Sequence, residues 1–449
     1  MDKKGKYFTA IVLAAGKGKR MKSAYPKVLY ELAGKPLIYY TLQELLKLKK
    51  HLREIIIVVG YKGKVVEAEV RKCLFNPSQA QQGRPRGQKP NKKIKINIKF
   101  VYQKKMLGTA NAVEIAARRV NNDNILVLCA DTPLITYNTL SLFISFFTRD
   151  NLSGSILTAN LNTSSSLGVI LRDESGRIMR VQEKLPLPKE VNPLENQNSE
   201  EVNSGIYCFK REKLLENLPL IKKNKIKGEY FLTDIVELFY DKGESIGGYL
   251  LNDAREILGI NTPQEACQAE EIMRQRILDD FLNRGVKIVD PKTTFIQNGV
   301  SIGKNSIIYP FTFIDKGVII GRNCLLGPFV HLRKGTCIKD NTQIGNFVEI
   351  NRTKIGNNVK VKHFSYLGDA FLGNEVNIGA GTVVANFDGK FKHKTVIEKQ
   401  AFIGSDTVLV APVKIGKAAA TGAGSVVTKN VKAKTVVVGV PARVLKKKR

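Results

Sequence analysis

The chain has 449 residues, which is long for one compact core, since about 100–200 residues per domain is usual. It is 43% hydrophobic and 25% charged and has no apolar run of about 18 residues, which excludes a membrane-spanning helix. Lysine and arginine number 72 against 40 acidic residues, a net charge of +32. This excess predicts anionic partners such as nucleotides, sugar phosphates, nucleic acid or acidic lipid, although a lysine-rich genome would produce the same excess.

The cysteines and the first residues indicate the compartment. The six cysteines form no CxxC pair, which predicts reduced, mostly buried thiols rather than disulfides or a metal site. They are Cys73, Cys129, Cys208, Cys267, Cys324 and Cys337. The start imitates a signal peptide, but its apolar stretch is short and runs directly into KGKRM, which favours a first strand entering a glycine loop. We therefore expect a cytoplasmic protein.

From residue 7 to about residue 253, short apolar runs alternate with stretches of helical spacing. The expected strands are Tyr7–Leu13, Glu54–Val59, Lys99–Tyr102 and Asn124–Ala130, and the expected helices are Pro36–Lys50 and Ala110–Val120. This alternation predicts an α/β domain, Rossmann-like, with a mostly parallel sheet covered on both faces. Its substrates should bind at the carboxyl ends of the strands.

Two further segments mark the domain organisation. Residues 75–99 are rich in Pro, Gly, Gln and basic residues without an acid, and we expect a long exposed loop there. Residues 262–285 have helical spacing with mixed charge, which predicts a linker helix. We expect a first domain at 1–255, a helical linker at 256–285 and a repeat domain at 286–449.

After Val286 the hydrophobic pattern repeats every six residues. The repeats are marked by aliphatic–glycine pairs at Ile302-Gly303, Ile320-Gly321, Leu326-Gly327, Ile344-Gly345, Ile355-Gly356, Leu367-Gly368, Leu372-Gly373, Ile378-Gly379, Ile403-Gly404 and Ile415-Gly416. Such hexapeptides predict a parallel β-helix, in which the aliphatic residue points inward and glycine allows the tight corner. The segment Asn386–Thr395 breaks the pattern, so it should project as a loop where binding residues can lie.

A glycine-rich loop follows the first expected strand. The segment Ile11–Met21, IVLAAGKGKRM, can present backbone N–H groups to phosphate, and Lys17, Lys19 and Arg20 add positive charge. No GK[ST] follows it, and the second strand ends in Gly60-Tyr61 with no acid, which argues against a Walker loop and a dinucleotide fold. A purely structural turn is the alternative interpretation.

With Pro26 and Lys27 this loop resembles the signature of sugar-1-phosphate nucleotidyltransferases. Further motifs are YQKKMLGTANAV at 102–113, LVLCADTPLI at 126–135, EVNSGIY at 201–207, GEYFLTDIV at 228–236, LGIN at 258–261 and, in the repeats, HFSYLGD, VNIGAGTVVANFDG and GSDTVLVAP. In this order they make nearly the whole chain similar to the bifunctional N-acetylglucosamine-1-phosphate uridyltransferase/glucosamine-1-phosphate acetyltransferases of bacterial wall-precursor synthesis. The resemblance implies an α/β nucleotidyltransferase domain followed by a left-handed parallel β-helix, and a homotrimer.

The same resemblance implies two reactions: acetylation of glucosamine-1-phosphate by acetyl-CoA, and uridylyl transfer from UTP to N-acetylglucosamine-1-phosphate. In uridylyl transfer a sugar phosphate attacks the α-phosphorus of a triphosphate, so a divalent cation and fixed positive charge are needed. Asp131 closes an apolar strand, where a lone carboxylate is costly unless it faces a cation. A capping role before Thr132-Pro133 is the alternative.

The resemblance assigns roles at the uridylyl site residue by residue. Asp131 and Asn261 would hold Mg²⁺, and Arg20 and Lys27 would stabilise the phosphates. The positions implied for uracil and ribose are Leu13, Ala14, Ala15, Gly16, Gln103, Gly108 and Thr109, and those implied for the sugar are Gly168, Glu183 and Asn203. Cys129 and Ala130 are further substrate positions. Two departures from the family pattern concern sugar selectivity: Ala130 replaces the usual glycine, and Leu167-Gly168-Val169 replaces YGR.

The acetyl site needs a base, because an amine acceptor arrives as ammonium and must lose a proton before it attacks a thioester. Among the four histidines His51, His331, His363 and His393, the resemblance selects His363, and we expect His331 and His393 to be solvated. It places the sugar phosphate on Arg333, Tyr366, Asn377 and Lys392, and acetyl-CoA on Ala380, Asn386, Phe387, Ser405 and Ala423.

Three departures affect the acetyl site. Asn351 stands where the family has a phosphate-binding lysine, Phe387 where it has tyrosine, and Gly439 where it has arginine. Arg352 and Arg443 are near enough in sequence to compensate, although adjacent strand residues normally point to opposite faces. A nucleotidyltransferase whose β-helix is a trimerising scaffold, or acylates another acceptor, is therefore the alternative. A third hypothesis has the basic segment 84–99 and the tail Lys446–Arg449 bind nucleic acid.

Overall fold

The computed structural model describes residues 7–22, 24–75, 96–162, 167–183 and 199–445. The chain divides into two compact units, and the division falls between residues 269 and 270, inside helix α8 (Pro263–Asn283). The expected loop at 75–99 and the basic tail lie almost wholly outside the described residues. The domain boundaries expected at 255 and 285 stay predictions. None of the described helices combines the length and apolar character needed to cross a membrane.

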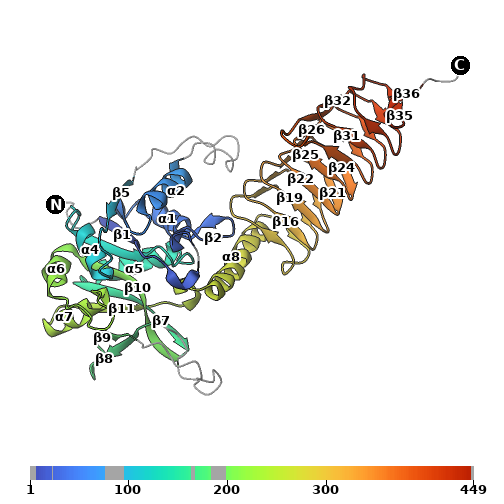
Figure 1. Ribbon diagram of the computed structural model, residues 1–449. Helices are drawn as coiled ribbons and strands as arrows, with labels where there is room; N and C mark the ends of the chain where they lie inside the picture. Colours follow the sequence, from blue (N-terminus) through green and yellow to red (C-terminus); the bar gives the residue numbers. More distant parts are fainter. Residues whose placement is uncertain (1–6, 23, 76–95, 163–166, 184–198, 446–449) are drawn as a thin grey trace, which may run out of the picture. The chain divides into compact units, whose positions relative to one another are not determined.

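The first unit is built on a sheet whose main path runs β11-β7-β10-β6-β1-β4-β5 (Figure 1). Its strands are β1 (Phe8–Ala14), β4 (Leu52–Val59), β5 (Asn97–Tyr102), β6 (Asn124–Cys129), β7 (Gly154–Asn162), β10 (Ser199–Lys210) and β11 (Ile246–Leu250), with β8 (Val169–Arg172) and β9 (Ile178–Gln182) attached through β10. Strands β1, β4, β5 and β6 are mutually parallel, which confirms the mostly parallel sheet. Strand β10 is antiparallel to both β6 and β7, which the sequence did not reveal.

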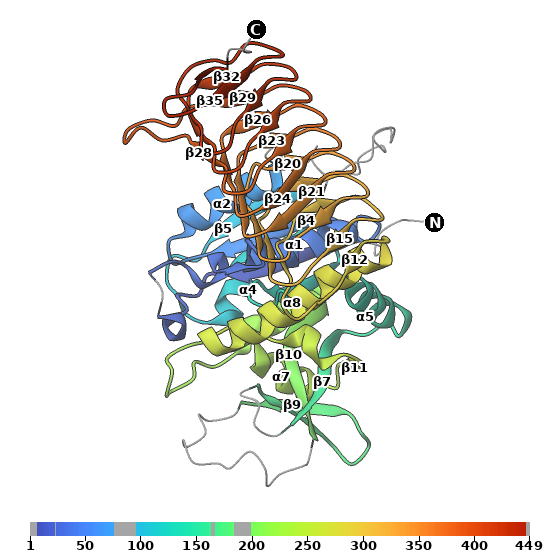
Figure 2. The ribbon, with the colours of Figure 1, turned by 90° about the vertical axis from the view of Figure 1, so that its right-hand side faces the viewer.

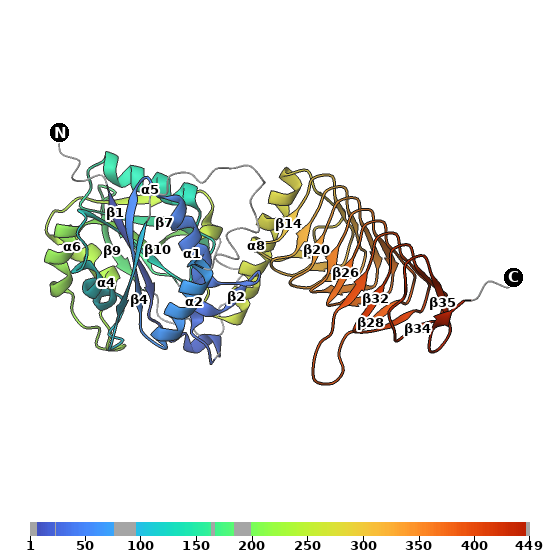
Figure 3. The same cartoon turned by 90° about the horizontal axis from the view of Figure 1, so that it is seen from above.

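Helices cover both faces of this sheet (Figure 3). They are α1 (Leu37–Lys47), α2 (Gly63–Phe75), α4 (Thr109–Ala117), α5 (Tyr137–Arg149), α6 (Arg211–Asn217) and α7 (Ile235–Asp241). Short elements complete the unit: β2 (Glu31–Leu32), β3 (Lys35–Pro36) and the 3-10 turns η1 (Lys19–Met21), η2 (Lys27–Leu29), η3 (Leu218–Leu220), η4 (Leu232–Asp234) and η5 (Ala254–Ile257). Alternate residues of β1 serve the two cores: Ala10 and Val12 pack with α1 and α5, whereas Ile11 packs with α4 and α7.

In the second unit three parallel sheets form the sides of a β-helix (Figure 2). The first sheet contains β12 (Lys287–Ile288), β15 (Ile307–Ile308), β18 (Leu325–Leu326), β21 (Gln343–Asn346), β24 (Lys360–His363), β27 (Asn377–Ile378), β30 (Phe402–Ile403), β33 (Ala420–Thr421), β35 (Val436–Val438) and an antiparallel last strand, β36 (Arg443–Val444). The second contains β13 (Phe295–Ile296), β16 (Thr312–Ile314), β19 (Val330–Leu332), β22 (Val348–Asn351), β25 (Tyr366–Gly368), β28 (Val383–Ala385), β31 (Val408–Val410) and β34 (Val426–Val427). The third contains β14 (Ser301–Ile302), β17 (Ile319–Ile320), β20 (Cys337–Ile338), β23 (Lys354–Ile355), β26 (Ala370–Leu372), β29 (Thr395–Ile397) and β32 (Val413–Ile415).

The predicted hexapeptide pattern accounts for this architecture. Aliphatic residues from successive coils, such as Ile314, Leu332 and Ile350, stack in one continuous core. At the corners there is no room for a side chain, because a Cβ on Gly345 would overlap the carbonyl oxygen of Lys362 in the next coil. The segment between β28 and β29 leaves the coil as a long loop, as expected (Figures 2 and 3).

All six cysteines are free thiols, as predicted. Cys208 and Cys324 are fully buried, Cys73, Cys129 and Cys337 are partly buried, and Cys267 is exposed. Cys267 is an exposed position of α8, and the mixed helical pattern of this segment does not decide which positions are covered.

Candidate active sites

The carboxyl ends of β1 and β6 meet at one edge of the first sheet. The Ala130 N–H donates to the Leu13 carbonyl at 3.0 Å, and the Tyr61 N–H donates to the Ala15 carbonyl at 3.1 Å. A Cβ on Gly60 would lie 2.8 Å from the latter oxygen, so glycine allows β4 to approach this turn closely. Gly16 is exposed, with open space where a side chain would be. The expected nucleotide positions 13–16 and 129–131 therefore lie together.

Three polar side chains converge beside this edge. The Lys27 ammonium donates to Oδ2 of Asp131 in a short contact and to Oδ1 of Asn261 at 2.8 Å. The side chains of Lys27 and Asp131 are only 12% and 20% exposed. The family resemblance predicts that Asp131 and Asn261 bind a metal ion and that Lys27 binds phosphate. In the structure the three side chains lie in one cluster. Asp131 therefore faces a cation. The neighbouring Thr132 hydroxyl donates back to the Cys129 carbonyl at 2.9 Å, at the end of β6.

Local structure fixes Asn261 in this cluster. The Ile260 N–H donates to the Asp131 carbonyl at 2.9 Å, which ties the LGIN motif to the end of β6. The N–H groups of Asn261 and Thr262 both donate to Oε2 of Glu265, at 2.6 and 2.8 Å. The Glu265 N–H in turn donates to the Thr262 hydroxyl at 3.2 Å, so a capping box begins α8 directly after the site.

The expected nucleotide-recognition residues form a second connected group. The amide of Gln103 donates to the Gly108 carbonyl at 3.1 Å and to Oδ1 of Asn111 at 3.0 Å. Gly108 has a φ of +102°, and a Cβ there would lie 2.7 Å from the backbone nitrogen of Tyr230. The Thr109 hydroxyl accepts from the Leu232 N–H at 2.9 Å. These contacts join the segments YQKKMLGTANAV and GEYFLTDIV.

The positions assigned to the sugar are partly brought together. The Asn203 N–H donates to the Gly168 carbonyl at 2.9 Å, and the buried Asn203 amide donates to the Tyr207 hydroxyl at 2.7 Å. Glu183 accepts a hydrogen bond from the Thr233 hydroxyl at 3.1 Å. Burial and the nearby Glu183 raise the pKa of Asp234. Thr233 and Asp234 were not predicted as site residues, although both lie in the GEYFLTDIV motif.

Two other predicted residues of the first unit, Arg20 and Cys129, differ in their exposure to solvent. Arg20 is exposed, in the short turn η1. Cys129 lies beside the polar cluster, and burial followed by the charge of Asp131 raises its thiol pKa to about 12. The thiol therefore stays protonated at neutral pH, and a nucleophilic role for Cys129 does not follow.

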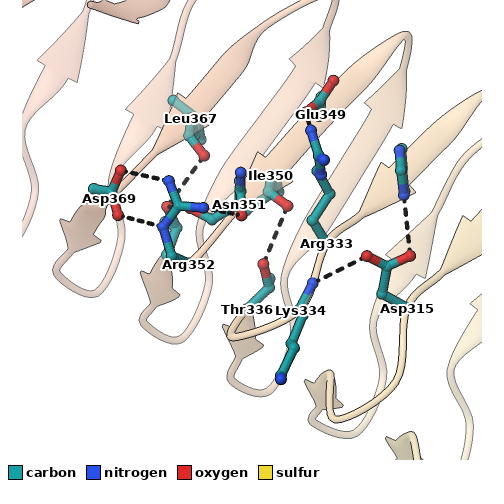
Figure 4. A network of polar contacts seen from close by, with 12 residues as sticks. Asp315, Arg333, Lys334, Thr336, Glu349, Ile350, Asn351, Arg352, Leu367 and Asp369 are labelled. Atoms are coloured by element: carbon teal, nitrogen blue, oxygen red, sulfur yellow. Dashed lines mark hydrogen bonds and ion pairs between the residues drawn. The ribbon is translucent and has the colours of Figure 1, made fainter. Parts of the chain in front are cut away.

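In the second unit, the side chains of Arg333, Glu349 and Tyr366 belong to successive coils along the second sheet. Arg333 donates to Oε1 of Glu349 at 2.9 Å, which raises the pKa of Arg333 (Figure 4). Glu349 is directly beside Tyr366 in the strand register. A Cβ on Gly368 would lie 2.6 Å from both the Tyr366 hydroxyl and the Asn386 amide nitrogen. The side chains of Tyr366 and Asn386 therefore meet above this glycine.

Arg352 organises the polar side chains next to them (Figure 4). Its guanidinium donates to both oxygens of Asp369, at 2.6 and 2.7 Å, and to Oδ1 of Asn351 at 2.9 Å. Asp369 also accepts from the Asn386 amide at 2.5 Å, and its pKa is lowered, mainly by Arg352. Arg352 is not on the opposite face from Asn351, because its φ of +50° places it in a corner rather than in extended strand.

The expected base and three of the expected cofactor residues lie on the first sheet and its edge, whereas Asn386 and Phe387 follow β28 of the second sheet. His363 is exposed at the end of β24, and Asn377 follows in the next coil. Ala380, Ser405 and Ala423 fall two residues after β27, β30 and β33, so they line one edge of the prism. Phe387 and Lys392 pair through their backbones in an isolated antiparallel β-bridge within the projecting loop.

Two of the histidines without an assigned role, His331 and His393, have acidic partners rather than solvent alone. His331 contacts Asp315 at 3.2 Å, and His393 contacts Asp388 at 2.6 Å. Gly439 stands where the family has a cofactor-binding arginine, and it has a φ of +91°. Arg443, the residue that could compensate, is exposed, and its guanidinium donates to the Ala442 carbonyl.

Sequence reasoning missed Glu349 and Asp369, which hold the two arginines of the acetyl site. The missed signal is the coil length: Glu349 follows Arg333 by 16 residues and Asp369 follows Arg352 by 17, so each pair is one coil apart. In a parallel β-helix, residues one coil apart are neighbours on the same side of the prism.

Comparison with known proteins adds independent evidence. The family model for nucleotidyl transferases matches residues 9–255, and the model for six bacterial transferase hexapeptides matches residues 317–352. The chain is 36% identical to the bifunctional protein GlmU of Heliobacterium modesticaldum, over 95% of this chain and 94% of that protein. It is 37% identical to the bifunctional protein GlmU of Pseudothermotoga lettingae, over 94% of each chain. The relative of the same name from Lactococcus lactis is 36% identical over 96% and 95%.

Proposed function

The chain belongs to the family of the bifunctional GlmU proteins and is a uridylyltransferase joined to an acetyltransferase, and we propose that the two groups of residues described above carry its two reactions. The second unit transfers acetyl from acetyl-CoA to glucosamine-1-phosphate. The first unit then transfers a uridylyl group from UTP to the resulting N-acetylglucosamine-1-phosphate, which gives UDP-N-acetylglucosamine and pyrophosphate.

The observation that carries the uridylyl proposal is that Asp131 and Asn261 both contact one positive charge, the Lys27 ammonium, at the strand ends. One carboxylate oxygen and one amide oxygen fit Mg²⁺, which takes few protein ligands and completes its shell with water and substrate phosphates. When bound, Mg²⁺ would supply charge neutralisation on the triphosphate and on the departing pyrophosphate.

The protein's own residues supply the remaining steps of uridylyl transfer. Backbone N–H groups of the glycine loop that follows β1 and the charges of Arg20 and Lys27 hold the triphosphate, whereas positions 13–16 contact the uridine. Gln103 and Thr109 orient the uridine, and Asn203 and Glu183 bind the acetamido and hydroxyl groups of the sugar. The sugar phosphate oxygen attacks the α-phosphorus, and the bond to pyrophosphate breaks. The chain therefore acts chiefly by positioning two anions against each other.

In acetyl transfer His363 accepts the proton from the ammonium of glucosamine-1-phosphate, so that the free amine can attack the thioester carbonyl. The carbon–sulfur bond breaks, and the CoA thiolate takes up a proton. Arg333, Tyr366, Asn377 and Lys392 hold the sugar phosphate. Acetyl-CoA runs along the edge formed by Ala380, Ser405 and Ala423, with its acetyl end near Asn386 and Phe387.

A row of stacked phenyl rings supports assembly with further copies of the chain, and we propose a homotrimer. Phe311, Phe329 and Phe347 lie at corners of successive coils, with ring centroids 4.8 and 4.9 Å apart and nearly parallel planes. Their exposed fractions are 53%, 44% and 61%. A continuous apolar row of this kind favours burial against further copies of the chain. The acetyl site would then be completed between copies, since its residues lie on flat sheet faces.

Sedimentation tests the assembly. We expect a trimeric mass for the wild type and a smaller mass for Phe329→Asp, because a charge in the row is costly to bury. Leu142→Asp, which changes a 57% exposed residue of α5, is the matched control and should stay trimeric. A trimeric Phe329→Asp variant would contradict the proposed interface.

We also propose a cytoplasmic location. The six free cysteines suit a reducing compartment, and UTP and acetyl-CoA are cytoplasmic metabolites.

A product assay tests the two reactions on the wild type. With acetyl-CoA and glucosamine-1-phosphate we expect release of a free thiol. With UTP, N-acetylglucosamine-1-phosphate and Mg²⁺ we expect release of pyrophosphate. Absence of thiol release would contradict the acetyl half and leave a nucleotidyltransferase with a β-helical scaffold, whereas absence of pyrophosphate release would contradict the uridylyl half.

A further inference from the structure

The Lys27 side chain contacts two parts of the uridylyl site. Its ammonium lies against the oxygens of Asp131 and Asn261, the two residues proposed as metal ligands. Its stem lies against the glycine loop, because a Cβ on Gly18 would come within 2.5 Å of Lys27 Cβ and 3.3 Å of Cδ. One side chain therefore connects the phosphate-binding loop with the cation ligands.

An ammonium and a divalent cation cannot both occupy the same two oxygens. Asp131 is mostly shielded from water, so its carboxylate is costly unless a positive charge is beside it, and Lys27 supplies that charge. A metal that binds there must expel the ammonium and bear the cost of separating this partly buried ion pair. The flexible four-carbon stem of lysine allows the ammonium to turn towards the adjacent glycine loop, where a triphosphate provides new negative charge.

We propose that Lys27 is a displaceable counter-ion. Its ammonium occupies the cation position beside Asp131 and Asn261 until Mg²⁺ and the nucleotide bind together, and it then turns to contact the triphosphate. This inference rests on the proposed metal ligands. It predicts that Lys27 weakens metal binding to the nucleotide-free enzyme and strengthens metal binding once UTP is present. Metal and nucleotide are thereby coupled, because each improves the site for the other.

Binding of Mn²⁺, followed by electron paramagnetic resonance in place of Mg²⁺, tests the inference. For the full-length protein without nucleotide we expect Lys27→Met to bind Mn²⁺ about tenfold more tightly than the wild type, which corresponds to about 1.4 kcal/mol. Lys27→Arg keeps the charge and should bind Mn²⁺ like the wild type. Lys62→Met is the control for net charge, since Lys62 is exposed and its ammonium lies on the Ala24 carbonyl. Added UTP should remove the advantage of Lys27→Met.

The possible outcomes separate this inference from the proposed function. Equal or weaker Mn²⁺ binding by Lys27→Met would overturn the counter-ion role, provided that its thermal unfolding matches the wild type. The metal ligands would stand in that case if Asp131→Asn still abolished Mn²⁺ binding in the presence of UTP. Undiminished binding by Asp131→Asn with UTP would instead overturn the metal ligands, and the counter-ion role with them.

Discussion

Replacing Arg352 by methionine should weaken acetyl-CoA binding without affecting uridylyl transfer. Arg352 holds both oxygens of Asp369, and Asp369 holds the Asn386 amide, so the substitution removes the support of a residue assigned to acetyl-CoA. It also frees Oδ1 of Asn351, which accepts from Arg352 at 2.9 Å. The change therefore acts on the position of Asn386 rather than on a group that touches the reacting atoms.

The size of the effect follows from the exposure of the pair. Arg352 is 39% exposed and Asp369 is 15% exposed. Shielded hydrogen bonds to charged groups contribute about 1.5–3 kcal/mol, and fully exposed ion pairs about 0–1 kcal/mol. After discounting for solvent screening, we expect a loss of about 1 kcal/mol, which raises the KM for acetyl-CoA about fivefold.

Steady-state kinetics of thiol release measure this change, and pyrophosphate release should equal that of the wild type. Arg322→Met is the matched control, because Arg322 contacts Asp340 at 3.0 Å in a similar corner pair. Within the described part of the chain, neither partner of that pair hydrogen-bonds a candidate site residue. If Arg352→Met and Arg322→Met changed the KM for acetyl-CoA equally, the link through Asp369 to Asn386 would be refuted.

Three further predictions concern the first unit and the pH response. Gly108→Ala should lower pyrophosphate release more than tenfold while thiol release is retained, because a φ of +102° with a ψ of −178° costs a residue with a Cβ about 1–3 kcal/mol and the Cβ would collide with the Tyr230 backbone; undiminished uridylyl transfer would contradict this. Asn203→Ala should raise the KM for N-acetylglucosamine-1-phosphate and lower the unfolding free energy by about 1–3 kcal/mol, because it leaves the buried Tyr207 hydroxyl without its partner; denaturant unfolding and kinetics measure the two effects. The lowered pKa of Asp369 adds stability to the folded β-helix above the unfolded-state pKa of about 3.9, and this stability is lost as the pH falls through the folded-state value. Arg352→Met raises that folded-state pKa, so acid titration followed by circular dichroism should show a smaller gain in stability between low and neutral pH than in the wild type.

The β-helix could be predicted from the sequence because its determinants are local. A pair such as Ile344-Gly345 places one side chain in the core and one glycine in a corner with no room for a Cβ. The strand ends of the first unit were predictable for a related reason, since an apolar run that stops at Asp131 marks both a buried strand and its exit. Both signals are contained within a few residues.

Contacts between distant segments could not be predicted in the same way. Lys27 lies 104 residues from Asp131 and 234 residues from Asn261, so only the folded chain shows that its ammonium contacts both. The direction of Arg352 depends on a corner φ of +50°, which its sequence neighbourhood does not reveal. The antiparallel direction of β10 was hidden because a strand buried on both faces has the same apolar pattern in either direction.

Separation of the two half-reactions by single substitutions tests the central claim most directly. Asp131→Ala and His363→Ala are assayed with glucosamine-1-phosphate, acetyl-CoA, UTP and Mg²⁺, and N-acetylglucosamine-1-phosphate is supplied separately to the second variant. We expect Asp131→Ala to release thiol without pyrophosphate, and His363→Ala to release pyrophosphate from the supplied sugar without releasing thiol. Loss of both activities in either folded variant would contradict the assignment of the two reactions to separate sites.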